Sequence, residues 1–412
     1  MKHTIFFISI FSFLFISNNS FAQDFYAVPF LSFPVSPFTT SMGATGSSLP
    51  SDDPYGFLLN PAQLGNISQT TNLSFAFYPV SSKLWGFDAY TINSLALNLG
   101  YNFKDDLNFP LSIGLGYSRS SFSFGDYWDQ DDIYSTLSLG VGIDYYIQFN
   151  AGISLKHIYS KLADHPVANE VGSAEATINA FDFGLLLNVP ILKTNDPDFE
   201  INLFDDNPLY PTLNFSLGYS QLNIGDEIYY IDPEQADPLP RQARLGYGLA
   251  LGFNLQLEQR TIKALGLDFT VDAQDILIER ELFVAPDGDS TVVLASTDYQ
   301  SFLGDIDIAK NIFMIEGSED VAAKVGVGIE LFEILTFRIG NINGANYDDL
   351  KTYGLELKSD GLLKLIASDE NPGLSYIADH FGLRFSYANY KAYSKTDLFG
   401  ISLFVKNFNS IF

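Results

Sequence analysis

The sequence predicts an all-β fold, a transmembrane antiparallel β-barrel of about 14 strands with an N-terminal plug segment. Three observations support this. Apolar residues alternate with small or polar residues along most of the chain, charged residues make up only 17%, and aromatic residues reach 15%. Successive side chains of a strand point to opposite faces, so the alternation predicts strands with one apolar and one polar face.

The first 22 residues have the layout of a secretory signal peptide. Lys2 is followed by an apolar run over 5–16, and residues 20–22 (Ser-Phe-Ala) place small side chains at a cleavage site before Gln23. The run is shorter than the roughly 20 residues that a membrane-spanning helix needs. The chain has no cysteine that lipid could be attached to. We therefore expect export and location in the outer membrane of a Gram-negative cell.

Residues 23–70 are apolar but rich in turn formers. Repeated prolines and glycines exclude a long helix or a central strand here. An apolar, irregular arm must bury itself, and the lumen of a barrel is the available place. We expect this segment to form a plug, with Phe30, Phe33 and Phe57 as candidates to line a path through the lumen.

Residues 71–412 carry the alternating runs of the barrel. Leu95, Leu97 and Leu99, for example, alternate with Ala96 and Asn98. The same pattern fits a half-exposed soluble sheet, but the runs approach the roughly 9–11 residues of a tilted membrane strand. Aromatic side chains at the ends of runs suit the girdles of a membrane barrel; they are Tyr78, Tyr101, Tyr117, Tyr219, Phe253 and Tyr387.

Further runs and loops follow the same logic. Other runs lie near 71–79, 111–117, 137–145, 147–159, 181–189, 212–220, 245–257, 263–272, 321–331, 333–340, 351–358, 380–390 and 398–408, with a weaker one at 84–91. Long acidic loops are expected at 126–132, 164–175, 194–210, 226–241, 279–299 and 359–379. Long loops of such barrels face outward.

Charge and motif content argue against several function classes. The net charge is 22 − 49 = −27, which disfavours nucleic-acid binding. His157, His165 and His380 follow the signal segment without a metal-ligand or nucleophile motif. The carboxylates of 126–132 are better read as a solvated turn than as a calcium site, because their spacing matches no calcium loop. We expect no enzyme activity, no cofactor and no metal site.

Several short motifs together resemble one family of outer-membrane proteins. In the arm they comprise Met42 and Gly43, Asp52 and Asp53, and Asn60, Pro61 and Leu64; a more specific match runs from 225–228 through 237–247. These residues resemble the PorV/PorQ family, which is related to FadL-type transporters of hydrophobic compounds. The similarity covers most of 24–275. The family often has an arginine where this chain has Phe38, which questions any contact that the arginine makes.

The resemblance implies a non-enzymatic, 14-stranded FadL-like barrel in a Bacteroidetes-type outer membrane that serves type IX protein secretion. Such a protein would bind or shuttle secreted cargo, with outer-membrane lipid and other secretion components as partners. Candidate residues for cargo contact in the loops are Asp226, Asp237, Arg241, Thr291 and Val293. The alternative is a FadL-like transporter of hydrophobic small molecules across the outer membrane, for which the plugged barrel and the apolar arm argue.

Overall fold

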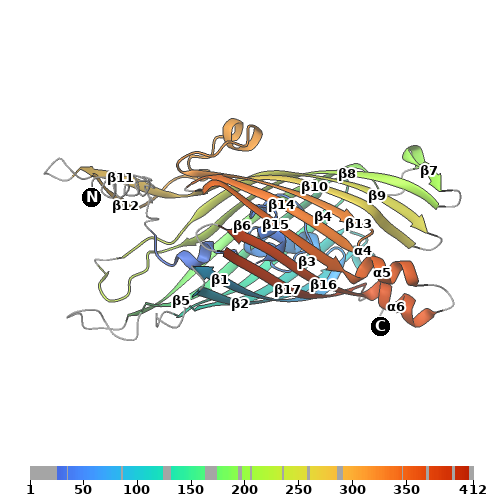
Figure 1. Cartoon of the computed structure of the whole chain (residues 1–412), viewed down its shortest axis with the longest axis horizontal. Coiled ribbons are helices and arrows are strands. Elements are labelled where there is room, and N and C mark those ends of the chain that lie inside the picture. The colour runs from blue at the N-terminus through green and yellow to red at the C-terminus, as the bar shows by residue number, and fades with distance from the viewer. Residues whose placement is uncertain are drawn as a thin grey trace, which may run out of the picture.

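A closed antiparallel barrel dominates the computed structural model (Figure 1). The structure describes residues 26–34, 36–84, 87–123, 131–162, 174–193, 197–204, 207–233, 236–257, 260–284, 291–345, 347–367, 371–391 and 395–407. Within them, fourteen strands pair in a ring that β1–β17 and β6–β8 close, which confirms the predicted fold class. The signal segment 1–22 and the aromatic residue that ends the chain, Phe412, lie outside the described residues.

The barrel strands are antiparallel throughout. In chain order they are β1 (Thr71–Leu84), β2 (Phe87–Asn102), β3 (Leu111–Ser123), β4 (Asp131–Asp144), β5 (Gln148–Lys161), β6 (Glu175–Leu192), β8 (Asn207–Gly225), β9 (Gln242–Leu257), β10 (Arg260–Ile276), β13 (Val321–Leu331), β14 (Leu335–Gly344), β15 (Tyr347–Lys358), β16 (Phe381–Lys391) and β17 (Lys395–Lys406). Hydrogen bonds between all neighbours leave no edge that lipid would have to solvate.

Three strands lie outside the ring. β7 (Ile201–Phe204) pairs with the start of β8, while β11 (Ile278–Val284) and β12 (Thr291–Tyr299) form a hairpin that projects beyond one end of the barrel (Figure 1). The short helices are η1 (Pro29–Ser32), α2 (Pro37–Ser41), η2 (Gly56–Leu58), α3 (Gln63–Ile67), α4 (Lys104–Leu107), η3 (Pro197–Phe199), η5 (Ile308–Phe313), α5 (Ser359–Ile366) and α6 (Pro372–His380). No helix among the described residues is long and apolar enough to cross a bilayer.

Two expectations about connections are wrong. The weak run at 84–91 is not a separate strand, because its residues end β1 and begin β2, with Leu84 opposite Phe87. The long loops also do not share one end. In an antiparallel ring successive connections alternate between ends, so 194–210 and 359–379 lie opposite the other four. We call the end with the 226–241 and 279–299 connections the hairpin end, and the other the α5 end.

The outer face of the wall is apolar. Leu137 is 58% exposed and Ile153 60%, whereas the adjacent Ser138 and Ser154 point inward and are buried. We call the exposed outward side chains of the strands the apolar belt. It comprises Phe75, Phe77, Leu97, Leu99, Leu115, Leu137, Leu139, Ile153, Leu155, Leu185, Leu217, Leu249, Ile329, Phe337, Ile339, Tyr353, Phe385, Ile401 and Leu403.

The prediction of an aromatic girdle is wrong in part. Tyr101 and Tyr117 are exposed on the outer face, as expected. Tyr78 instead shares the inward phase of β1 with Ala76, and its hydroxyl lies 2.9 Å from the Ser402 hydroxyl. Tyr219 points outward but is covered by another part of the chain. Period alone cannot assign a face where both phases contain aromatic residues.

The segment before β1 lies inside the barrel (Figure 1). We call residues 26–70 the inner segment. Lumen-facing glycines of the strands leave room for it: a Cβ on Gly218 would lie 1.9 Å from the Ser47 oxygen, and one on Gly184 1.9 Å from Asn60 Oδ1. A Cβ would lie between 2.0 and 2.6 Å from the inner segment at five further glycines: Gly140, Gly152, Gly326, Gly340 and Gly354. The small-residue phase of the strands is thus a surface moulded to the inner segment.

Candidate binding site in the barrel lumen

The arm motifs of the sequence all contact the barrel wall. The Gly43 amide donates to Thr352 Oγ1 at 3.0 Å, and Met42 packs against Gly326. Gly43 adopts φ +71°, and a side chain there would meet backbone oxygens of β13 and β14 at under 3 Å. Glycine is therefore required at this point both for its backbone conformation and for its size.

A second motif fixes the middle of the inner segment. Asn60 is fully buried; its amide group donates to the Ser47 oxygen at 2.7 Å and to the Leu185 oxygen of β6 at 3.0 Å. Its Oδ1 accepts from the Ala62 amide, which holds the turn that Pro61 enters. Leu64 packs on Gly140. One amide side chain thus joins two parts of the inner segment to the wall.

The two adjacent aspartates play different parts. Asp52 forms an ion pair of 2.6 Å with Arg384 of β16. Burial favours the neutral acid, but the charge of Arg384, aided by Lys358 and Lys406, holds the pKa of Asp52 well below its usual range. Asp53 is enclosed: it accepts from the Ser36 hydroxyl and from the Tyr55 amide, and burial raises its pKa to about 6.

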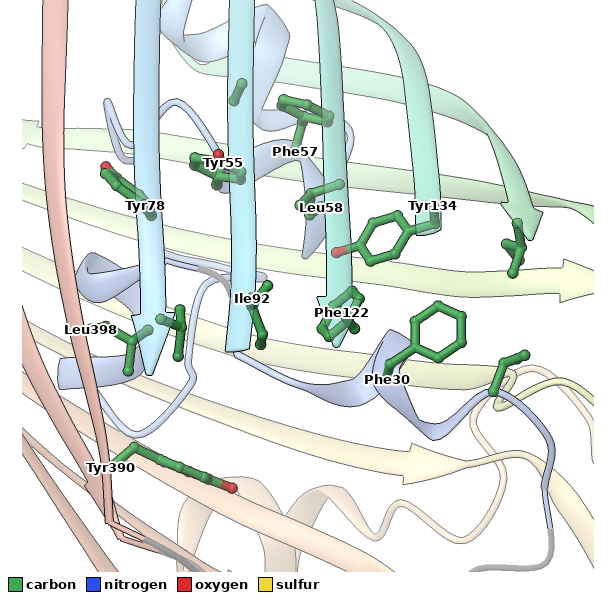
Figure 2. Close-up of a cluster of buried hydrophobic side chains, with 14 of the residues drawn as sticks. Phe30, Tyr55, Phe57, Leu58, Tyr78, Ile92, Phe122, Tyr134, Tyr390 and Leu398 are labelled. Carbon is green, nitrogen blue, oxygen red and sulfur yellow. The ribbon is translucent and has the colours of Figure 1, made fainter. Parts of the chain in front are cut away.

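A cavity of about 270 Å³ lies between the inner segment and the wall at the hairpin-end side of the lumen. We call it the aromatic cavity. Phe33 lines it and stacks on Tyr90 with ring centroids 5.0 Å apart. Phe30 and Phe57 do not line it; both are 1% exposed, and Phe30 packs on Phe122 (Figure 2). Further apolar lining residues are Leu31, Tyr55, Leu58, Leu59, Leu222, Ile276, Ala322, Ile342, Ala345, Tyr347 and Tyr390.

One wall of the aromatic cavity carries positive charge. Arg244 of β9 and Lys324 of β13 are 5% and 4% exposed, and both donate to the same acceptor, Gln274 Oε1 of β10. Within the described residues, neither cation has a carboxylate within 4 Å. The nearby Asp272 is engaged by the Gly46 and Ser47 amides. Asp320 also lines the cavity, and Lys156 does so while paired with Asp182 at 3.0 Å.

A second cavity of about 360 Å³ lies on the α5-end side of the inner segment, and we call it the ionic cavity. Charged side chains of alternating sign line it. Arg338 pairs with Glu356 at 3.2 Å, with both side chains 4% exposed, and its guanidinium lies over the Phe38 ring at 4.1 Å. Lys358 pairs with Glu330 at 2.6 Å. Phe38 thus packs against an arginine of the barrel wall.

The predicted cargo-contact residues divide between two neighbouring structures at the hairpin end. Asp226 and Arg241 line a surface groove, and the Arg241 guanidinium stacks on the Tyr299 ring at 3.6 Å. Asp237 pairs with Ile228 in an isolated bridge. Thr291 and Val293 lie on β12, opposite Val284 and Leu282 of β11.

The histidines and the acidic turn also have places in the fold. His157 Nδ1 lies 3.0 Å from Asn179 Oδ1 on the outer face, and His380 Nδ1 lies 2.8 Å from the Tyr376 oxygen. Asp132 is buried and accepts from the Ser160 hydroxyl. Asp126, Asp129 and His165 lie outside the described residues. Across the part of the chain that the structure describes, no three His, Asp or Glu side chains gather as metal ligands.

Sequence reasoning missed the cation pair and most of the cavity wall. A signal was present: Arg244 and Lys324 occupy the same phase of their strands as Gly246 and Gly326, which is the phase that faces the lumen. A charged side chain among the glycines of the lumen-facing phase indicates a group that acts inside the lumen. Tyr390 shares the inward phase of β16. Tyr347 has the outward phase of β15 and lines the cavity only because a β-bulge separates it from Leu350, so the period gave no signal for it.

Comparisons with known proteins give structural neighbours only. No family model and no curated protein matches this chain. It is similar to the solved "CymD monoaromatic hydrocarbon channel", with 12% identity and a TM-score of 0.42 over 91% of this chain and 97% of that one. It is also similar to the Ralstonia pickettii toluene transporter TbuX, with 12% identity and a TM-score of 0.40 over 90% of this chain and 97% of that one. A Pseudomonas aeruginosa FadL homologue shows 11% identity and a TM-score of 0.38 over 90% of this chain and 98% of that one. The fold assignment rests on the strand pairing itself.

Proposed function

We propose that this protein is an outer-membrane barrel that binds a hydrophobic small molecule in the aromatic cavity and passes it across the membrane. The aromatic cavity is the observation that carries the proposal. It is a concave, mostly apolar site with a few polar groups at one side, as ligand sites usually are. It lies within a closed wall whose outer face is the apolar belt.

The belt supports the membrane location. A soluble protein rarely exposes contiguous apolar patches beyond a few hundred Å². Here the exposed outward side chains extend around the strands from β1 to β17. Lipid hydrocarbon is the environment in which such a surface has no cost, and a closed strand ring is one of only two architectures that satisfy the backbone there.

The inner segment supports a gated path. It separates the aromatic cavity from the ionic cavity, and residues of the segment line both. The Asp52–Arg384 ion pair joins it to β16, and Asp272 of β10 accepts from the Gly46 amide. A molecule held in the aromatic cavity reaches the α5 end only if part of this segment shifts. The segment is in this proposal a plug that opens during passage.

The cation pair narrows the ligand chemistry. Two buried cations that share a neutral acceptor repel each other; the carboxylate of the nearby Asp272 offsets part of this repulsion, and a bound anion in contact with them stabilises them further. Arg244 and Lys324 stand in this arrangement at one wall, while Phe33, Tyr90 and Tyr347 provide apolar surface elsewhere. A ligand with an aromatic or aliphatic body and a single anionic end group fits both parts better than a neutral hydrocarbon does.

A matched pair of probes tests this proposal. Isothermal titration of the purified protein in detergent should show that 2-naphthoate binds and that neutral naphthalene binds more weakly. Arg244→Gln combined with Lys324→Gln should reduce 2-naphthoate affinity at least tenfold and leave naphthalene binding unchanged. Lys263→Gln, a cation of the ionic cavity, is the control and should leave both unchanged. If neither 2-naphthoate nor naphthalene bound, the proposal would be contradicted.

Binding of a secreted protein is the second candidate function, and the shape of the hairpin end favours it. The β11–β12 hairpin projects beyond the barrel (Figure 1). Its base is tied to the 226–241 connection, since the Leu277 amide donates to the Arg241 oxygen at 2.8 Å. Such a hairpin offers strand edges to a partner sheet. Deleting residues 283–297 should abolish co-purification of a secreted cargo, and unchanged recovery would count against it.

A further inference from the structure

A segment outside the barrel lies on its outer wall near the hairpin end. We call residues 300–316, between β12 and β13, the outer shoulder; it includes η5. Two contacts hold it to the wall. The Tyr219 hydroxyl of β8 donates to the Phe302 oxygen at 2.6 Å, and the Asp305 amide donates to Asp275 Oδ2 of β10 at 2.6 Å. The Phe302 ring also stacks on the Tyr219 ring at 4.2 Å.

The wall side of the shoulder is a small hydrophobic core of its own. Ile306 and Ile312 are at most 8% exposed and pack with Ala243 of β9 and Ala273 of β10, both fully buried. Small alanines on the outer face of the strands leave space for the larger shoulder side chains. The shoulder therefore covers this part of the wall, which is shielded from solvent and lipid.

The exposed surface of the shoulder is apolar too. Phe313 is 73% exposed, Met314 66% and Phe302 57%, and Ile308 is also exposed. A surface segment that needed only to cover the wall would present polar side chains outward. Four large exposed apolar side chains within thirteen residues require a second apolar environment.

The place of Phe313 shows what that environment is. Its ring stacks on the Tyr247 ring of β9 with centroids 6.4 Å apart. Tyr247 pairs in register with Leu217 of β8, and Leu217 and Leu249 belong to the apolar belt. The exposed side of the shoulder is thus continuous with the belt at its hairpin-end border. Lys310 and Asp307 are exposed on the same segment, as at the boundary between lipid and water.

We infer that the outer shoulder is an interfacial anchor that inserts Phe302, Phe313 and Met314 into the bilayer lipid at the hairpin-end border of the belt. This inference rests on the proposed membrane location of the barrel. The anchor lies on the β8–β10 side, so it widens the lipid-contacting surface on that side of the barrel. Aromatic side chains at this depth resist movement in either direction, because their rings favour the interface.

Tryptophan fluorescence with brominated lipids tests the inference. The two tryptophans of the chain, Trp85 and Trp128, are first replaced by phenylalanine. Phe313→Trp is then introduced, and the protein is reconstituted into phosphatidylcholine vesicles with and without bromine on the acyl chains. Leu137→Trp in the belt reports on barrel insertion. Glu319→Trp, just before the start of β13, is the matched control on the same connection.

We expect brominated lipid to reduce emission at least twofold for Phe313→Trp and Leu137→Trp and to leave Glu319→Trp nearly unchanged. Quenching at 137 without quenching at 313 overturns the anchor and leaves the barrel in the membrane. Absence of quenching at 137 overturns the membrane location, and with it the anchor. A Phe302→Trp variant gives an independent second reading of the shoulder and should behave as Phe313→Trp does.

Discussion

The two halves of the lumen differ in how they hold the inner segment. On the α5 side, charged side chains of both signs line the ionic cavity, and several of them are held in ion pairs such as Arg338–Glu356 and Asp52–Arg384. On the hairpin side, rings and aliphatic chains surround the aromatic cavity, and its two central cations have no carboxylate within 4 Å among the described residues. The α5 side holds the inner segment in a fixed position, because its charged side chains are paired with one another within the protein. The other has apolar surface and two cations that no carboxylate of the described residues contacts within 4 Å, and an anionic ligand group can bind them.

Breaking the central ion pair of the ionic half should have the largest effect. Arg338→Gln removes the closer of the two cations that pair with Glu356; both side chains of the Arg338–Glu356 pair are 4% exposed, and the buried carboxylate keeps only Lys358, at 3.4 Å, and the Ser386 hydroxyl. Removal of one member of a buried pair typically costs about 3–5 kcal/mol. Urea unfolding in detergent should show a loss of this size. Lys351→Gln, which removes an exposed pair with Asp349, is the control and should change stability by less than about 1 kcal/mol. Equal losses for both variants would contradict the buried role.

The seat of the inner segment can be tested on one strand. Gly326→Ala places a Cβ 2.6 Å from the Met42 oxygen, whereas Gly328→Ala, two residues on, meets its nearest atom at 3.5 Å. Both changes restrict the unfolded chain equally. Overpacking should make Gly326→Ala less stable by about 1–3 kcal/mol and leave the inner segment more open to protease. Gly328→Ala should be as stable as the parent protein or up to about 1 kcal/mol more stable, with unchanged protease sensitivity. A similar loss of stability in both variants would exclude a specific seat.

The pH dependence of stability should report the enclosed carboxyl of Asp53. Burial raises its pKa to about 6, above the ordinary value of about 3.9 in the unfolded chain. The folded state therefore holds an extra proton between these two values, so the contribution of Asp53 to stability is greatest at low pH and is lost as the pH rises through 6. Asp53→Asn should remove this slope between pH 4 and 6. An unchanged slope in the variant would mean that another group titrates.

The smallest effect is expected at the apolar wall of the ligand site. Phe33→Ala removes a lining ring of the aromatic cavity, and one contact between this ring and an aromatic ligand is worth about 0.5–1.5 kcal/mol beyond burial. Titration should show a roughly tenfold weaker affinity for both naphthalene and 2-naphthoate. Phe109→Ala, an exposed ring outside the lumen, should not change either affinity. A selective loss for the anion alone would place the ligand body elsewhere.

Much of the fold could be predicted because a single two-residue alternation of apolar and small side chains runs along the strands. Lipid on one side of the wall and the inner segment on the other make every second residue apolar and its neighbour small, as Leu137 and Ser138 show. The positions of strands and the closed ring follow from that alternation. Period could not place Tyr78, because an aromatic ring is acceptable on either face when the inner segment supplies Tyr55 as a partner.

The candidate site was less predictable because it is assembled from distant strands. Phe33 was proposed from the sequence and lines the cavity, but its partner Tyr90 lies on β2 and the cations lie on β9 and β13. The sequence does not show which strands become neighbours in the closed ring. It also does not show the register between β9, β10 and β13, which places Arg244 and Lys324 beside Gln274. The outer shoulder was missed for a related reason: its short apolar stretch has no strand period, and its role depends on the alanines of the wall beneath it.

The most direct test is to locate a heavy-atom ligand in the lumen. Crystals of the protein soaked in 4-bromobenzoate should show an anomalous bromine peak inside the aromatic cavity, beside Phe33 and Tyr90, with the carboxylate toward Arg244 and Lys324. Arg244→Gln combined with Lys324→Gln should abolish the peak. A bromine found only on the apolar belt, or in the ionic cavity, would contradict the assignment of the aromatic cavity as the binding site.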